Sequence, residues 1–171
     1  MMHQDFAAEL VKEIPRLRRF ARGLVGDAAL ADDLVQDCVE RALVKQHLYD
    51  RARPLRAWLF AILRNIHVSQ WRRSQHLGPA AELDADGEEM AIAPEQEQAM
   101  SVQLISEALD LLPQRQREVL ILISLEEMSY KEAAEIMAVP IGTVMSRLSR
   151  ARNALQALLE KRGTTVLRVV K

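Results

Sequence analysis

Residues 78–99, GPAAELDADGEEMAIAPEQEQA, divide the chain into two parts because they contain seven acidic residues and no lysine or arginine. Gly78, Pro79, Gly87 and Pro94 interrupt this segment, and such a composition is typical of a linker. The alternative is a long surface loop, but structureless loops of this length are uncommon inside compact domains. The 171-residue sequence therefore predicts two small domains, residues 1–77 and 100–163, joined by an acidic tether over 78–99 and followed by an unassigned tail, 164–171.

The formal net charge of -1 hides an uneven distribution of charge. Residues 1–77 carry a net charge of +4, residues 78–99 one of -7, and residues 100–171 one of +2. A nearly neutral chain would by itself argue against a nucleic-acid binder. Here two basic domains are cancelled by one acidic tether, so DNA is not excluded as a partner. The free protein is expected to bind DNA weakly, because affinity grows with the number of phosphates neutralised.

Several other classes of protein are disfavoured by what the sequence lacks. Cys38 is the single cysteine, so neither an intramolecular disulfide nor a cysteine-based zinc site is expected. No apolar run of about 18 residues predicts a membrane span, and MMHQDFAAEL does not have the pattern of a secretory signal, so a cytoplasmic protein is expected. No P-loop, HExxH motif or nucleophile elbow is present. We therefore expect no enzyme, no small-molecule substrate, no metal and no cofactor.

Apolar residues recur at helical spacing in both predicted domains. The clearest series are Leu30, Leu34, Cys38 and Ala42, and Leu55, Trp58, Leu59, Ile62, Leu63 and Ile66. No strand is expected, although the tail 164–171 has β-propensity. The sequence predicts an all-α fold. The expected helices span residues 6–25 with a kink or restart at Pro15, 28–45, 55–73, 99–111, 113–124, 129–137 and 141–160.

The last two expected helices predict a helix-turn-helix. Ser129 and Glu132 form a capping box, and Pro140 begins the second helix. The residues expected to face inward are Ala133, Ala134, Ile136 and Val139 on one helix and Val144, Leu148, Ala151 and Leu155 on the other. The donors spaced for base and phosphate contacts are Thr143, Ser146, Arg147 and Arg150, flanked by Lys131 and Arg152. An ordinary helix pair with a solvated polar face would show the same pattern.

Three stretches of this domain, LPQRQREVL, SYKEAAEIM and GTVMSRLSRAR, closely resemble the C-terminal DNA-binding domain of bacterial extracytoplasmic-function (ECF) sigma factors, group IV of the sigma-70 superfamily. In the first domain, ALADDLVQDCVERAL (29–43) is similar to the family's polymerase-binding helix, and RAWLFAILRNIHVSQWRR (56–73) to its promoter −10 helix. The matches cover nearly the whole chain. The resemblance implies a region 2 domain and a region 4 helix-turn-helix that bind core RNA polymerase and direct promoter-specific initiation, with an anti-sigma factor as a further partner.

The resemblance also implies a role for each polar face. The 29–43 helix would dock on the β′ clamp helices, and the polymerase β flap is a second expected contact. The docking residues would be Asp32, Asp33, Gln36, Asp37 and Glu40. A solvated face and a carboxylate metal site are the alternatives there, although the Glu-x-x-His motif of di-metal bundles is absent. Promoter −35 DNA would be read by Lys131, Thr143, Ser146, Arg147, Arg150 and Arg152.

The −10 element would be opened by the 55–73 helix and the loop 46–56, which in the family hold an extruded base and must recover its unstacking free energy. The expected contacts are Tyr49, Arg56, Arg64, Asn65, Ser69, Arg72 and Arg73. Asn65 matches the family's usual asparagine. Trp58 is expected in the core, whereas Trp71 suits either the core or a base.

Two positions depart from the family pattern. Ser69 stands where aspartate is frequent, and Met145 stands where a basic residue is frequent, which affects the −35 preference rather than the docking mode. The tether would thread the basic cleft of the polymerase as an electrostatic mimic, or serve as a plain connection. Two other functions remain open: a sigma-like decoy that binds an anti-sigma factor, and a stand-alone helix-turn-helix repressor.

Overall fold

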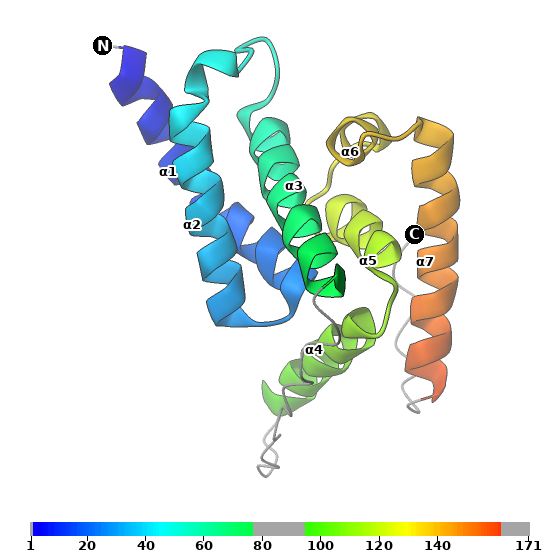
Figure 1. The fold of residues 1–171 in the computed structure, drawn as a ribbon. Helices are drawn as coiled ribbons and strands as arrows, with labels where there is room; N and C mark the ends of the chain where they lie inside the picture. Colours follow the sequence, from blue (N-terminus) through cyan, green and yellow to red (C-terminus); the bar gives the residue numbers. More distant parts are fainter. Residues whose placement is uncertain (1, 77–94, 162–171) are drawn as a thin grey trace.

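The structure, a computed structural model, describes residues 2–76 and 95–161. Over these ranges every regular element is helical and no strand is present (Figure 1), which confirms the predicted all-α fold. Most of the predicted tether and all of the tail 164–171 lie outside the described residues. Within the two described ranges, no helix combines the length and the apolar character that a membrane crossing requires.

Three helices form an N-terminal unit: α1 (Met2–Val25), α2 (Ala28–Val44) and α3 (Leu55–His76), with a short 3₁₀ turn, η1 (Gln46–Leu48), after α2. Gly26 ends α1 at a φ of 74°, in the left-handed region that glycine adopts without strain. Asp27 then caps α2 by accepting a hydrogen bond of 2.8 Å from the Leu30 amide. Helix α1 continues through Pro15, so the restart considered there is not needed.

The C-terminal unit contains α4 (Glu95–Asp110), α5 (Gln114–Leu120), the π-helical turn η2 (Ile121–Leu125), α6 (Tyr130–Met137) and α7 (Ile141–Lys161). The expected helix over 113–124 is thus α5 followed by η2. Helix α4 begins four residues before the predicted start at 99, inside the end of the predicted tether.

The two units pack together around one continuous hydrophobic core, with α3 lying between α2 and the pair α5 and α6 (Figure 1). Within the N-terminal unit, the rings of Phe20 and Phe60 stack with their centroids 4.6 Å apart. At the seam between the units, Gly23 of α1 approaches η2 so closely that an added Cβ would lie 2.8 Å from Ile121 Cδ1. The sequence predicts two tethered domains, and the structure shows them in contact.

One predicted core position is wrong. Leu30 is 53% exposed, and α2 instead buries Ala31, Leu34, Val35, Cys38 and Ala42. A strict four-residue spacing drifts around a helix that has 3.6 residues per turn, so Leu30 leaves the face on which Leu34 and Cys38 lie. Cys38 is a buried core residue, as expected, and burial raises the pKa of its thiol to about 12.

Candidate nucleic-acid interface

Helices α6 and α7 form the helix-turn-helix that the sequence predicts. The Ser129 hydroxyl accepts from the Glu132 amide at 3.2 Å, and the Glu132 carboxylate accepts from the Ser129 amide at 2.9 Å, which completes the capping box. The Ser129 hydroxyl also donates to the Glu132 carboxylate at 2.7 Å, and this hydrogen bond, followed by the one from the Ser129 amide, lowers the pKa of Glu132. Ala138 ends α6 in the left-handed region, with φ at 52°, and Pro140 precedes α7. The capping box and this turn fix the direction in which α7 leaves.

Helix α7 packs on one side and presents polar residues on the other. Val144, Leu148 and Ala151 are buried, whereas Ser146 and Arg150 are exposed, and Thr143 and Arg147 are half-buried on the same face. The Ser146 hydroxyl donates to the Thr143 carbonyl at 3.1 Å. Within the described residues no carboxylate forms an ion pair with Arg147 or Arg150. This face therefore retains positively charged donors for an external partner.

The two flanking cations of this motif lie on different elements or faces. Lys131 is exposed on α6. Arg152 is exposed two residues after Arg150, which places it on the far side of α7. There it lines an apolar groove of about 360 Å³ together with Ile105, Leu109, Leu120, Ile121, Ser124, Leu125, Leu155, Gln156 and Leu159.

The residues predicted to contact the −10 element divide into two groups. Asn65, Ser69, Arg72 and Arg73 are exposed on α3. Asn65, Ser69 and Arg72 have the i, i+4, i+7 spacing of one helix face. Trp71, next to Arg72, is 45% exposed. Trp58 packs against the core, as the sequence predicts. The first group is thus open to solvent along one side of α3.

The second group is already engaged within the molecule. The Tyr49 ring lies 5.9 Å from Phe6 and 5.2 Å from Trp58, measured between centroids, and its hydroxyl donates to the Arg53 carbonyl at 2.6 Å. Arg56 pairs with Glu13 at 3.0 Å. Arg64 donates to the buried Glu118 carboxylate of α5. These three side chains have partners that a nucleic acid would have to replace.

The acidic face of α2 lies largely in solvent. Asp32, Asp33, Gln36 and Glu40 are exposed, and Asp37 is half-buried. Its internal contacts are peripheral: Arg18 pairs with Asp32 at 3.3 Å, and the Gln70 amide donates to Asp37 at 3.3 Å. Among the described residues, no group of three histidine, cysteine or carboxylate side chains is placed to hold a metal ion. The carboxylates instead present negative charge that suits a basic partner.

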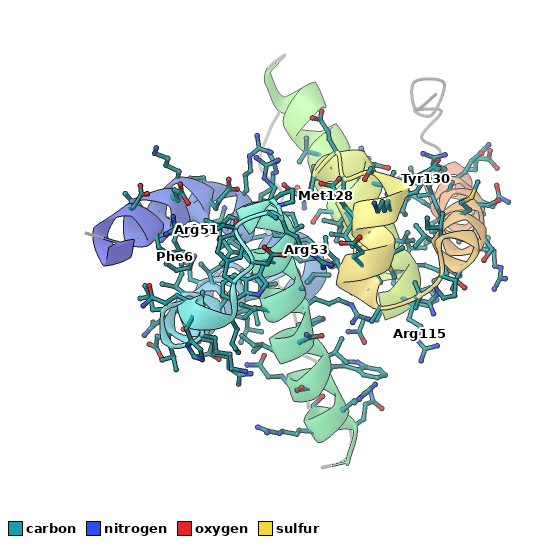
Figure 2. All side chains as sticks on the ribbon, turned by 90° about the horizontal axis from the view of Figure 1, so that it is seen from above. Phe6, Arg51, Arg53, Arg115, Met128 and Tyr130 are labelled. Carbon is teal, nitrogen blue, oxygen red and sulfur yellow. The ribbon has the colours of Figure 1, made fainter. Side chains whose placement is uncertain are left out.

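Sequence reasoning missed the ion pairs that cross between the two units. Arg19 of α1 donates to both carboxylate oxygens of Glu126, at 2.6 Å and 2.9 Å. Arg53, on the loop before α3, pairs with Glu135 of α6 at 3.7 Å, and Figure 2 shows Arg53 at that end of α3. Arg64 and Glu118 form a third pair of this kind. In each pair an arginine of the N-terminal unit contacts a glutamate of the C-terminal unit.

The acids in these pairs gave no signal in the sequence. Glu118 follows two arginines in QRQRE and resembles a solvated position, yet it is only 3% exposed, and Glu126 is 1% exposed. Burial raises the pKa of Glu118, opposed by the nearby charge of Arg64. Their partners lie 54 and 107 residues away in the chain, so no local pattern predicts the pairing.

Two protein-family models match this chain, one in each unit. A family model described as Sigma-70, region 4 matches residues 103–155, and one described as the Sigma2 domain of PhyR matches residues 10–64. The first match covers α6 and α7 as far as residue 155, and the second covers α1 from residue 10, all of α2, and α3 as far as residue 64. The two units together thus define the chain as a sigma factor of the sigma-70 class.

The particular family follows from full-length relatives. The ECF RNA polymerase sigma factor EcfG of Rhodopseudomonas palustris (strain TIE-1) is 40% identical over 88% of this chain and 83% of its own length. The ECF RNA polymerase sigma factor SigL of Mycobacterium tuberculosis (strain ATCC 25618 / H37Rv) is 35% identical over 87% and 85%. This chain belongs to the ECF RNA polymerase sigma factors, which confirms the resemblance of its sequence to that family.

Two solved structures share this arrangement. The sigma factor RpoE of Bartonella quintana, in complex with the anti-sigma factor NepR, has a TM-score of 0.76 and 42% identity over 92% of this chain and 98% of that chain. CnrH, in complex with the cytosolic domain of CnrY, has a TM-score of 0.68 and 28% identity over 92% and 89%.

Proposed function

We propose that this chain is a group IV ECF sigma factor that binds core RNA polymerase through the acidic face of α2 and reads promoter DNA through two separate helices. Asp32, Asp33, Gln36, Asp37 and Glu40 meet the β′ clamp helices, and the C-terminal unit meets the β flap. The observation that carries the proposal is the α7 face of Arg147 and Arg150, which is positively charged and has no acidic ion-pair partner among the described residues. The protein itself performs no covalent chemistry.

In this proposal α7 enters the major groove at the −35 element. Thr143, Ser146 and Arg150 lie on its exposed side, where hydroxyl and guanidinium donors reach base edges. Arg147 and Lys131 neutralise phosphates beside it, and Arg152, on the far side of α7, contributes least. Met145 is 51% exposed at the start of the same helix, so an apolar side chain lies in solvent near these donors.

The −10 element is held by α3. The exposed Asn65, Ser69 and Arg72 line one face of the helix, and Arg73 adds a charge beside it. Arg64 joins them only when it leaves Glu118, and Arg56 only when it leaves Glu13. The Tyr49 ring packs against Phe6 and Trp58, so it must leave these contacts before it can stack on a nucleobase.

An anti-sigma factor completes the proposal. RpoE of Bartonella quintana and CnrH were each solved with an anti-sigma factor or the cytosolic domain of a partner. The same helices are present here at 42% and 28% identity, which supports a protein inhibitor of the same kind for this chain.

A decoy function is the second candidate. It is favoured by the match of residues 10–64 to the Sigma2 domain of PhyR, because the PhyR of Bartonella quintana is an anti-anti-sigma factor. A decoy would bind an anti-sigma factor and leave the α7 face unused. The stand-alone repressor is disfavoured because it gives the α2 face no partner.

Run-off transcription with purified core polymerase separates these functions. Core polymerase with a pool of genomic templates is assayed with and without this protein, and promoter-specific transcripts are expected only when it is present. The variant Arg150→Ala is the matched control and is expected to remove most of them. Absence of any specific transcript with the wild-type protein would contradict a sigma factor and favour the decoy.

A further inference from the structure

Met145 is a large apolar side chain that the fold leaves in solvent on helix α7. It is 51% exposed and lies between the buried Val144 and the exposed Ser146. Among the described residues, the hydrophobic core and the side chains packed against it do not include Met145. Ile141, one turn earlier, is 45% exposed, and residues four apart lie on the same side of a helix. The start of α7 thus offers an apolar surface beside its hydroxyl and guanidinium donors.

The neighbours of Met145 on the outward side of α7 are small. Gly142 lies three residues before it and Ser149 four residues after it, and both are exposed. A Cβ added at Gly142 would contact nothing within 4 Å beyond its chain neighbours and the backbone of its own helix, and the φ of Gly142 is not positive. Neither packing nor backbone conformation therefore requires glycine here. A second surface can approach the backbone of this turn closely, with Met145 projecting beside it.

The chemistry of Met145 selects among the four bases of a major groove. Thymine presents a C5-methyl group there, whereas guanine, adenine and cytosine are distinguished by their hydrogen-bond donors and acceptors. A polar base edge placed against a thioether loses its hydrogen bonds to water without a replacement. A methyl group gains an apolar contact instead, and the unbranched, flexible methionine side chain adapts to its position. Met145 therefore favours thymine over the other bases.

We propose that Met145 is a specificity-determining residue of the −35 contact, with its side chain packed against the methyl group of a thymine in the major groove. Gly142 permits the close approach of α7 that this contact requires. The apolar surface is continuous with Arg147 and Arg150, which form no ion pair among the described residues, and this positive charge favours DNA over a protein as its occupant. The inference rests on the proposed function, in which α7 enters the major groove.

Deoxyuridine tests the methyl contact, because it pairs as thymidine does and lacks only the C5-methyl group. Holoenzyme first selects its −35 sequence from duplex DNA randomised in that region. Fluorescence anisotropy then measures affinity for the selected duplex with each thymine replaced in turn. The wild-type protein is expected to lose affinity about fourfold at one thymine, the cost of one methyl group left out of an apolar contact. Equal affinity for every duplex would overturn the proposal and is the result expected if a protein occupies this surface.

Variants at position 145 assign the contact to this side chain. Met145→Gln keeps the length but makes the end polar, so it is expected to bind the thymine and deoxyuridine duplexes equally, whereas Met145→Leu is expected to keep the difference. Met145→Arg is expected to select guanine at this position, because a guanidinium binds O6 and N7 of guanine. Val11→Ala, at a 60% exposed position of α1, is the matched control and keeps the wild-type preference. Wild-type sensitivity to the methyl group in Met145→Gln would overturn the proposal.

Gly142→Ala tests the close approach separately from folding. Its midpoint of urea unfolding is expected to equal or exceed that of the wild type, because alanine favours a helix and nothing obstructs the added Cβ. Its affinity for the selected −35 duplex is expected to fall about tenfold, as for the loss of one base contact. Unchanged DNA affinity would contradict the close approach. A wild-type holoenzyme that selects no −35 sequence would overturn the proposed function itself, whereas a selected sequence that is insensitive to its methyl groups would overturn this inference alone.

Discussion

Helices α3 and α7 are both assigned to promoter DNA, yet they lie in different surroundings. Helix α7 packs along one side, and its arginines Arg147 and Arg150 form no ion pair within the described residues. Helix α3 packs against α2 on one side and against α5 and α6 on the other (Figure 1). One of its arginines, Arg64, is therefore neutralised by an ion pair with Glu118. Under the proposed function, the −35 surface is available in the free protein, whereas the −10 surface lacks Arg64 until that side chain leaves Glu118.

The same substitution at the two helices is the strongest test of this difference. Arg64→Met leaves the buried Glu118 without its ion-pair partner and is expected to lower the free energy of unfolding by about 3 kcal/mol. Arg150→Met is expected to change it by less than about 0.5 kcal/mol, since Arg150 is exposed. Urea unfolding measures both, and equal losses would contradict the comparison.

How far the sequence predicted this difference depends on the range of each interaction. Ser129 with Glu132, and Pro140 before α7, are local signals, so the helix-turn-helix and its exposed donors followed from neighbouring residues. The core position predicted for Leu30 is wrong because a four-residue spacing drifts around a helix of 3.6 residues per turn. Arg64 was correctly placed on α3 but its partner was not, because an ion pair across 54 residues has no local pattern.

DNA binding sharpens the comparison on the α7 side. Arg150→Ala is expected to weaken binding to −35 DNA by about 2 kcal/mol while binding to core polymerase stays intact, because a guanidinium contact to a base or phosphate is lost. Arg152→Ala, two residues on and on the far side of α7, is the matched control and is expected to cost much less. Fluorescence anisotropy with holoenzyme and a labelled promoter measures both. Equal loss of DNA and polymerase binding would contradict the division of roles.

The acidic face of α2 is expected to act independently of both helices. Asp37→Lys reverses a charge on the surface proposed to meet the β′ clamp helices and is expected to weaken binding to core polymerase about tenfold, or about 1.4 kcal/mol. Glu9→Lys, an exposed position on α1, carries the same charge change and is expected to bind normally. Competition against a labelled sigma factor for core polymerase provides the measurement. Unchanged affinity for core polymerase in Asp37→Lys would show that this face is solvated and does not bind the polymerase.

The smallest expected effect concerns His67, which lies on α3 near the arginines of the seam. Burial, and then the charges of Arg117 and Arg64, lower the pKa of His67 below its ordinary value. The unfolded chain therefore takes up this proton at a higher pH than the folded protein, so the stabilising effect of neutral His67 is complete above about pH 6.5 and is lost as the pH falls toward the lowered pKa. His67→Gln is expected to lose less stability than the wild type between pH 7.5 and 5.5 in urea unfolding. His47→Gln, at an exposed position in η1, is expected to lose as much stability as the wild type over this pH range. An equal loss in all three proteins would show that protonation of His67 does not contribute to the loss of stability in acid.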